Sequence, residues 1–145
     1  MEVIGLASDH AGFEMKEFIK QYLVSMDYKV QDFGTYSFDS CDYTDFAHSM
    51  ANAIEVECLS LGFAFCGSGN GINISLNRHQ KVRSAYCWLP EIAKLARAHN
   101  DANVCVIPAR FIDQERCLKI VAKFLKHEFE GGRHQQRIDK IEIKE

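Results

Sequence analysis

The chain alternates between short apolar runs and longer stretches in which apolar residues recur at helical spacing. Near-continuous apolar runs predict buried strands at residues 3–7, 61–66, 82–87 and 104–107. A fifth strand is predicted at residues 28–33, where apolar and polar residues alternate before Gly34. The pattern therefore predicts five short strands.

Helices are predicted between these strands. Apolar stripes cover residues 18–26 and 46–59, and Pro90 suits the first turn of a helix over residues 90–99. The clearest stripe has apolar residues at i, i+3, i+4, i+7 and i+8, namely Cys117, Ile120, Val121, Phe124 and Leu125. Two glycines then separate this helix from a polar helical tail that begins near Arg133.

Strands that alternate with helices favour right-handed parallel crossovers. The predicted fold class is α/β, a Rossmann-like, doubly wound, five-stranded parallel sheet in a single domain over residues 1–145, with a C-terminal helical tail. Ligands bind such sheets beyond the carboxyl ends of the strands. Candidate chemistry is therefore expected in the loops after the first, third, fourth and fifth strands.

Charge and hydropathy narrow the classes of function. The formal net charge is −3 and the isoelectric point is about 6.1, so no dominant basic face is expected for nucleic acid or an anionic membrane. No stretch approaches the roughly 18 apolar residues of a membrane span, and the first residues lack the pattern of a secretory signal. We expect a soluble, cytoplasmic protein.

Six cysteines stand at positions 41, 58, 66, 87, 105 and 117, without a CxxC pair. We interpret them as reduced thiols, because neither a secretory signal nor paired spacing indicates disulfides. All except Cys66 lie in or beside apolar stretches, where a free cysteine is usually a small buried hydrophobic residue. The chemistry-bearing residues show no compact metal-ligand spacing, so we predict neither a metal nor a cofactor.

A glycine-rich loop follows the third predicted strand and consists of Cys66, Gly67, Ser68, Gly69, Asn70 and Gly71. Alternating glycines let backbone N–H groups approach an anion, and a helix N-terminus here is expected to lower the pKa of Cys66. The spacing disfavours a dinucleotide-binding GxGxxG turn and a Walker A loop. A cysteine phosphatase loop is also disfavoured, because Ile72 occupies the place of its arginine. A tight turn around a buried cysteine stays open at this point.

Three further groups of polar residues are candidates. Asp9 and His10 follow the first strand and offer a carboxylate and an imidazole to sugar and phosphate, although a helix-capping Asp beside an exposed His has the same pattern. His99 precedes the fifth strand, where a lone His is more often structural. Arg133 and Arg137 are spaced i, i+4, which suits phosphate binding on one helical face but also describes a solvated basic tail.

Four segments together resemble the ribose-5-phosphate isomerase B family, which also includes galactose-6-phosphate isomerase subunits. They are SDHAGFEMK, CGSGNGINISLNR, RAHNDANV and EGGRHQQRI, in family order over nearly the whole chain. The resemblance implies a metal-free isomerase that interconverts ribose 5-phosphate and ribulose 5-phosphate. It also implies a homodimer, or a dimer of dimers, whose site is built from two subunits, with no nucleic acid or membrane partner.

The resemblance implies roles for individual residues. Cys66 would be the base that moves a proton between C2 and C1, and His99 the acid that opens the furanose ring. Ser68 joins the catalytic residues because it keeps the hydroxyl of the threonine that is frequent there. The residues assigned to substrate binding are Asp9, His10, Gly67, Ser68, Gly69, Asn70, Gly71, Asn100, Arg110, Arg133 and Arg137. Thr44 and residues 76–78 depart from the family pattern.

Two alternatives stay open on the sequence alone. A galactose-6-phosphate isomerase would share the mechanism, but it needs room for one more carbon and usually two unlike subunits. A non-catalytic regulator that binds sugar phosphates would fit the same fold. The presence of both Cys66 and His99 favours an enzyme.

Overall fold

The computed structural model describes residues 2–144, and over these residues it contains one sheet of five parallel strands. The strands are β1 (Val3–Ser8), β2 (Lys29–Asp32), β3 (Leu61–Cys66), β4 (Ser84–Tyr86) and β5 (Val104–Pro108). Their order in space is β2-β1-β3-β5-β4. The prediction of a doubly wound, five-stranded parallel sheet is confirmed.

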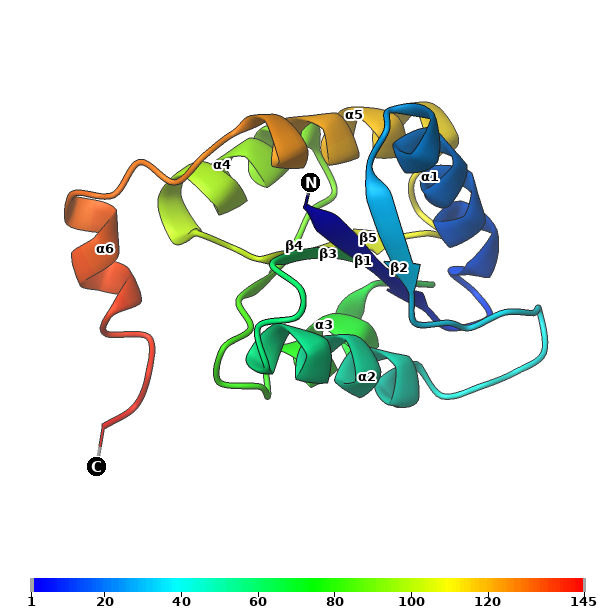
Figure 1. Ribbon diagram of the computed structural model, residues 1–145, viewed down its shortest axis with the longest axis horizontal. Helices are drawn as coiled ribbons and strands as arrows, with labels where there is room; N and C mark the ends of the chain where they lie inside the picture. The colour runs from blue at the N-terminus through cyan, green and yellow to red at the C-terminus, as the bar shows by residue number, and fades with distance from the viewer. Residues whose placement is uncertain (1, 145) are drawn as a thin grey trace.

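Helices cover both faces of the sheet (Figure 1). One face carries α1 (Phe13–Ser25), α4 (Pro90–Asn100) and α5 (Gln114–Lys126), and the other carries α2 (Tyr43–Glu55) and α3 (Asn70–Leu76). The alternation of side chains along β3 supplies both cores. Phe63 and Phe65 enter the first core, where Phe63 meets Phe124 of α5 with ring centroids 5.4 Å apart. Ala64 and Cys66 enter the second core, against α2 and α3.

The order of the strands creates a switch point between β1 and β3. The chain passes from β1 outward to β2 and then returns to place β3 on the opposite side of β1. The loop after β1 leads to α1 on one face, whereas the loop after β3 leads to α3 on the other (Figure 1). A crevice between such diverging loops is where open α/β sheets bind ligands.

Some element boundaries differ from the predicted ones. β4 is shorter than the predicted residues 82–87, because the Arg83 N–H donates to the side-chain oxygen of Asn103. α2 ends at Glu55 rather than near residue 59, because Glu57 takes a left-handed φ of 62°. These boundaries depend on individual backbone contacts rather than on the apolar pattern.

The predicted tail helix is present as α6 (Arg133–Ile138). It packs against α4, and none of its residues is buried. Figure 1 shows α6 and the C-terminal segment set apart from the layered body. Ile141 and Ile143 in this segment are 61% and 91% exposed, so these two apolar side chains are largely exposed.

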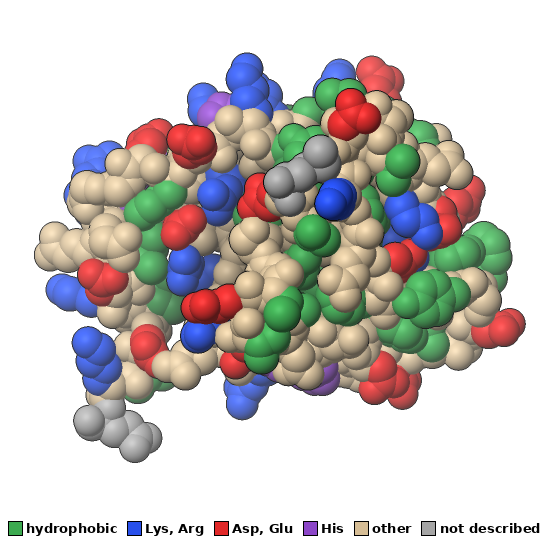
Figure 2. All heavy atoms as spheres, viewed as in Figure 1, with side chains coloured by type: hydrophobic (Ala, Val, Ile, Leu, Met, Phe, Trp, Pro, Cys, Tyr) green, Lys and Arg blue, Asp and Glu red, His purple; other side chains and the backbone are tan. Residues whose placement is uncertain are grey.

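The face shown in Figure 2 carries basic and acidic side chains interspersed with one another. This distribution agrees with the small net charge of −3. Among residues 2–144, every helix is too short or too polar to cross a lipid bilayer.

Candidate active site

Cys66 ends β3 and is 4% exposed. The backbone N–H groups of Gly69, Gly71 and Ile72, at the start of α3, lie close enough to its sulfur to favour the thiolate. Gly69 has a left-handed φ of 83°, and a Cβ on Gly71 would lie only 2.4 Å from the Tyr43 ring. Gly69 therefore permits the left-handed turn before α3, and Gly71 leaves room for the Tyr43 ring.

Burial raises the pKa of the Cys66 thiol above its ordinary value, and the carboxylate of Asp9 raises it further. The N–H groups of Ile72, Gly69 and Gly71 lower the pKa without outweighing these effects. The start of α3 thus lowers the pKa of Cys66 as expected, but burial and Asp9 outweigh it, so the net shift is upward. At neutral pH the sulfur is held mainly as a thiol.

A cleft of about 610 Å³ opens beside Cys66 at the carboxyl edge of the sheet. The loops after β1, β2, β3 and β5 form its walls. The predicted site residues among its lining are Asp9, His10, Cys66, Gly67, Ser68, Gly71 and Arg110. The structure therefore brings the first loop, the glycine-rich loop and Arg110 together at the switch point.

The side chains of Asp9 and His10 each accept a hydrogen bond from a backbone N–H group. Asp9 is 7% exposed, and its Oδ1 accepts the Gly12 N–H at 3.0 Å in the turn before α1. His10 Nδ1 lies 3.2 Å from the Cys41 backbone nitrogen, which donates its hydrogen. The neutral imidazole of His10 therefore carries its proton on Nε2.

The loop after β2 was not among those expected to carry chemistry, yet it supplies Cys41, Asp42 and Tyr43 to the cleft. The available signal was the general rule that every strand ends at the same edge of a parallel sheet. Cys41 is half-buried and Cys58 is exposed, so the prediction that both are buried is wrong. It is confirmed for Cys87, Cys105 and Cys117.

Arg110 reaches the cleft from the loop after β5. Its backbone N–H donates to the Gly67 oxygen at 3.0 Å, and the Ala109 N–H donates to the Cys66 oxygen at 2.9 Å. A Cβ on Gly67 would lie 3.2 Å from Cδ of Arg110, so the arginine lies directly on the glycine-rich loop. This places one cation against the glycine-rich loop.

His99, Asn100, Arg133 and Arg137 do not line this cleft. His99 and Asn100 end α4, shortly before Val104 pairs with Gly62 at the amino end of β5. Cys66 pairs with Pro108 at the opposite end of the same ladder. Arg133 and Arg137 lie in α6, which packs beside α4. Within one protomer the predicted site is therefore divided between the carboxyl ends and the amino ends of the strands.

His99 forms a cluster with Glu130 and His134 that the sequence spacing did not indicate. Their nearest ligand atoms lie within 4.8 Å of one another. The two imidazole rings are stacked, with centroids 4.1 Å apart and planes inclined by 13°. A metal ion lies in the plane of each imidazole that binds it, so these stacked rings cannot share one ion unless a ring turns.

Comparisons with known proteins agree with this fold and site. Residues 4–141 match the sequence pattern of the family described as Ribose/Galactose Isomerase. The ribose-5-phosphate isomerase B of Escherichia coli strain K12 is 38% identical over 141 residues, which cover 97% of this chain and 95% of that protein. The crystal structure of a ribose 5-phosphate isomerase from Thermotoga maritima is 45% identical, with a TM-score of 0.95 over 97% of both chains. Ribose-5-phosphate isomerase B from Mycoplasma genitalium, solved with bound ribulose-5-phosphate, is 40% identical, with a TM-score of 0.91 over 96% of this chain and 93% of that chain. The resemblance seen in the four sequence segments is confirmed, and the chain belongs to the ribose/galactose isomerase family.

Proposed function

We propose that this chain interconverts ribose 5-phosphate and ribulose 5-phosphate through a cis-enediolate. The observation that carries the proposal is the cleft at the switch point of the sheet, which is lined by Cys66 together with Asp9, His10 and Arg110. Membership of the isomerase family and the likeness to a structure that holds ribulose-5-phosphate support the same substrate.

The proposed chemistry follows from the groups present. Moving a carbonyl between C1 and C2 requires removal of a weakly acidic C–H proton, for which Cys66 is the proposed base. The Ser68 hydroxyl and the loop of residues 67–71 are proposed to bind the sugar and enediolate oxygens, where negative charge develops. His99 is the proposed acid that opens the furanose ring. Each of these steps is assigned to a protein group, so the proposal includes neither a metal nor a cofactor.

We further propose a homodimer in which the end of α4 and α6 of a second copy complete the cleft. Asn100, Arg133 and Arg137 would then join His10 and Arg110 in binding the substrate and its phosphate. The support is twofold. These residues lie at the other edge of their own protomer, and α6 has no buried side chain of its own. Phosphate held at the remote end orients the reacting carbons over the thiol.

A coupled assay of the purified chain on ribose 5-phosphate and on hexose 6-phosphates tests the substrate, with and without a chelator. We expect activity on the pentose phosphate that is unaffected by the chelator and abolished in Cys66→Ala. Cys58→Ala, which changes an exposed cysteine away from the cleft, is the matched control and should keep full activity. Preference for a hexose 6-phosphate would assign the chain to the galactose branch, and the lack of turnover with any sugar phosphate would reject the enzymatic proposal.

A further inference from the structure

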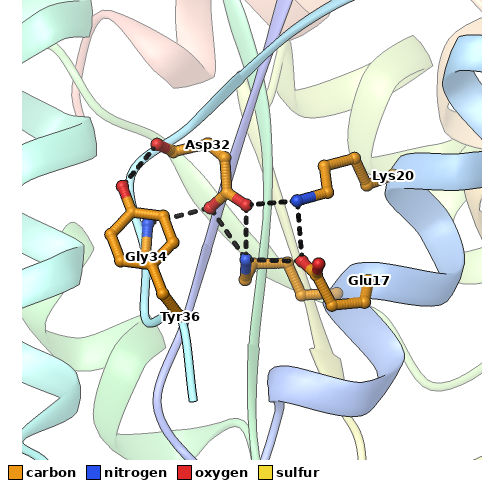
Figure 3. Close-up of polar contacts among 6 residues, drawn as sticks. Glu17, Lys20, Asp32, Gly34 and Tyr36 are labelled. Atoms are coloured by element: carbon orange, nitrogen blue, oxygen red, sulfur yellow. Dashed lines mark hydrogen bonds and ion pairs between the residues drawn. The ribbon is translucent and has the colours of Figure 1, made fainter.

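A buried cation lies under α1, outside the cleft. The side chain of Lys16 is 0% exposed, and its ammonium nitrogen lies 2.6 Å from Asp32 Oδ2 and 2.9 Å from Glu17 Oε2. Lys20 Nζ lies 2.8 Å from the same Asp32 oxygen and 2.9 Å from the same Glu17 oxygen (Figure 3). We call these four residues the Lys16–Asp32 network. Its two cations and two anions balance in charge.

Stability alone does not explain this arrangement. The desolvation of the charged groups offsets much of the Coulombic attraction between them. An apolar pair of similar volume is therefore often at least as stable. An ion pair differs from an apolar pair in being directional, because its hydrogen bonds determine which atoms meet. The functional consequence of the network therefore lies in the groups to which Asp32 is hydrogen-bonded.

Asp32 ends β2 and fixes the segment that follows it (Figure 3). Its Oδ1 accepts the Gly34 N–H at 2.9 Å, and its backbone oxygen accepts the Tyr36 hydroxyl at 2.9 Å. The rings of Phe13 and Tyr36 flank the ammonium of Lys16, with centroids 5.4 and 5.6 Å from Nζ. The network thus connects α1 to residues 33–36.

This segment in turn holds the carboxyl end of β1. The Ser8 N–H donates to the Gly34 oxygen at 2.7 Å, and the Thr35 N–H donates to the Ser8 oxygen at 2.8 Å. On the other side, the Asp9 N–H donates to the Phe65 oxygen of β3 at 3.3 Å. The end of β1 is therefore hydrogen-bonded to residues 34–35 on one side and to β3 on the other. Only residues 34–35 depend on Asp32 for their position.

We propose that Lys16 is a positioning residue for the cleft. Through Asp32 and the segment after β2 it fixes Ser8, and Ser8 directly precedes Asp9 and His10. Lys16 does not line the cleft, so it acts only through where it places these two residues. Where the effect is measured as isomerisation, the inference rests on the proposed function.

The first test compares Lys16→Met with Val121→Ala, which removes buried methyl groups of α5 from the core that α1 also packs into. Both are assayed at a temperature at which circular dichroism shows them fully folded. We expect Lys16→Met to lower kcat/KM for ribose 5-phosphate on the order of 10-fold to 100-fold, mainly through KM, because the binding groups are misplaced. Val121→Ala should stay within about twofold of wild type. An unchanged kcat/KM in folded Lys16→Met would overturn the proposal.

A double-mutant cycle with His10→Ala separates positioning from stability. If Lys16 acts through the end of β1, Lys16→Met costs much less activity in the His10→Ala chain than in wild type. The effect of Lys16→Met on the melting temperature should be the same in both backgrounds, because the loss of the ion pairs destabilises the fold whether or not the His10 side chain is present. Equal losses of kcat/KM in the two backgrounds would refute the route through β1.

A third measurement does not depend on turnover. The chemical shifts of the His10 imidazole, followed by NMR, should change in Lys16→Met and remain as in wild type in Val121→Ala. If wild type shows no isomerase activity while His10 responds, the proposed function falls and the positioning role stands. If wild type is active but neither His10 nor kcat/KM responds, the positioning role falls. Should Lys16→Met fail to fold, Asp32→Asn replaces it and is expected to change the same quantities in the same direction.

Discussion

The pKa of the Cys66 thiol is determined by effects that act in opposite directions. Burial and the charge of Asp9 favour the neutral thiol, while the N–H groups of Gly69, Gly71 and Ile72 favour the thiolate. A thiol with a raised pKa gives a stronger base once it is ionised, but a smaller fraction of it is ionised at neutral pH. The balance makes the ionisation of Cys66 sensitive to the charge at position 9.

We predict that Asp9→Asn lowers the pKa of Cys66. The substitution removes the negative charge that opposes the thiolate and keeps a side-chain oxygen for the Gly12 N–H. The rate at which iodoacetamide alkylates Cys66 follows the thiolate fraction, so its pH dependence, resolved by mass spectrometry of the Cys66 peptide, gives the pKa. Asp42→Asn, which changes an exposed carboxylate of the same cleft, is the control and should leave the profile unchanged. A pKa that stays the same or rises in Asp9→Asn would contradict this interpretation.

The roles of His99 and Cys66 can be separated by substrate. Ribose 5-phosphate is mostly a closed furanose, whereas an aldotetrose 4-phosphate cannot close that ring, because its terminal oxygen is esterified. We expect His99→Asn to lose on the order of 10²-fold in kcat/KM on the pentose and to keep appreciable activity on the tetrose. Cys66→Ala should fail on both substrates. Equal losses of His99→Asn on the two substrates would place His99 in the proton transfer itself.

The sequence predicts some of the candidate site residues better than others. Asp9 follows an apolar strand and Cys66 ends one, and the common direction of parallel strands brings them to one edge. Arg110 was indicated only by the family resemblance, and it reaches the same edge from the loop after β5. Cys41 lies in a polar loop without periodicity, so only the neighbourhood of His10 reveals its place. The pKa of Cys66 depends on burial and on Asp9 together, which are properties of packing rather than of sequence order.

At the scale of elements, α1 and β2 are joined by ions as well as by apolar packing. Burial favours the protonated form of the Asp32 carboxyl, but hydrogen bonds from Lys16 and Lys20 outweigh this and lower its pKa. The pKa of Glu17 is lowered for the same reason, since its hydrogen bonds to these lysines outweigh partial burial. The junction between α1 and β2 is therefore stabilised by ionised carboxylates.

This junction predicts a specific acid sensitivity. Because the pKa of Asp32 is lower in the folded than in the unfolded chain, its stabilisation is present above about pH 4 and is lost as the pH falls through the folded value. We expect the free energy of unfolding in urea to fall more steeply below about pH 4 for wild type than for Asp32→Asn, so that the two curves converge. Asp39→Asn, an exposed carboxylate on the following loop, should run parallel to wild type. Parallel curves for wild type and Asp32→Asn would remove Asp32 from the acid response.

Element boundaries were predictable where burial alone determines them. β3 was predicted at residues 61–66 and is found at Leu61–Cys66, because a central strand covered on both faces is apolar throughout. β4 and the end of α2 were not, because the side chain of Asn103 and the left-handed backbone of Glu57 determine them. Such local contacts leave no periodic signal in the sequence.

At the scale of the whole molecule, the direction of α4 separates the predicted catalytic groups. A helix that connects parallel strands runs back along the sheet, so α4 begins near the carboxyl edge and places His99, in its last turn, near the amino edge. Cys66 stays at the carboxyl edge. In a two-fold dimer each contact is made twice. If α6 and the end of α4 of one copy cover the cleft of the other, the same contacts complete the second cleft as well.

Complementation between inactive chains tests this arrangement. We predict that co-expression of differently tagged Cys66→Ala and His99→Asn chains gives a heterodimer with one site that combines an intact Cys66 and an intact His99. With random pairing, half of the dimers are mixed and half of their sites are intact, so the mixture should show about a quarter of wild-type activity on ribose 5-phosphate. The tandem-purified heterodimer should show about half. Co-expression of two differently tagged Cys66→Ala chains is the control and should stay inactive. If each site lay within one chain, the purified heterodimer would gain nothing over its parents, and the division of Cys66 and His99 between subunits would be wrong.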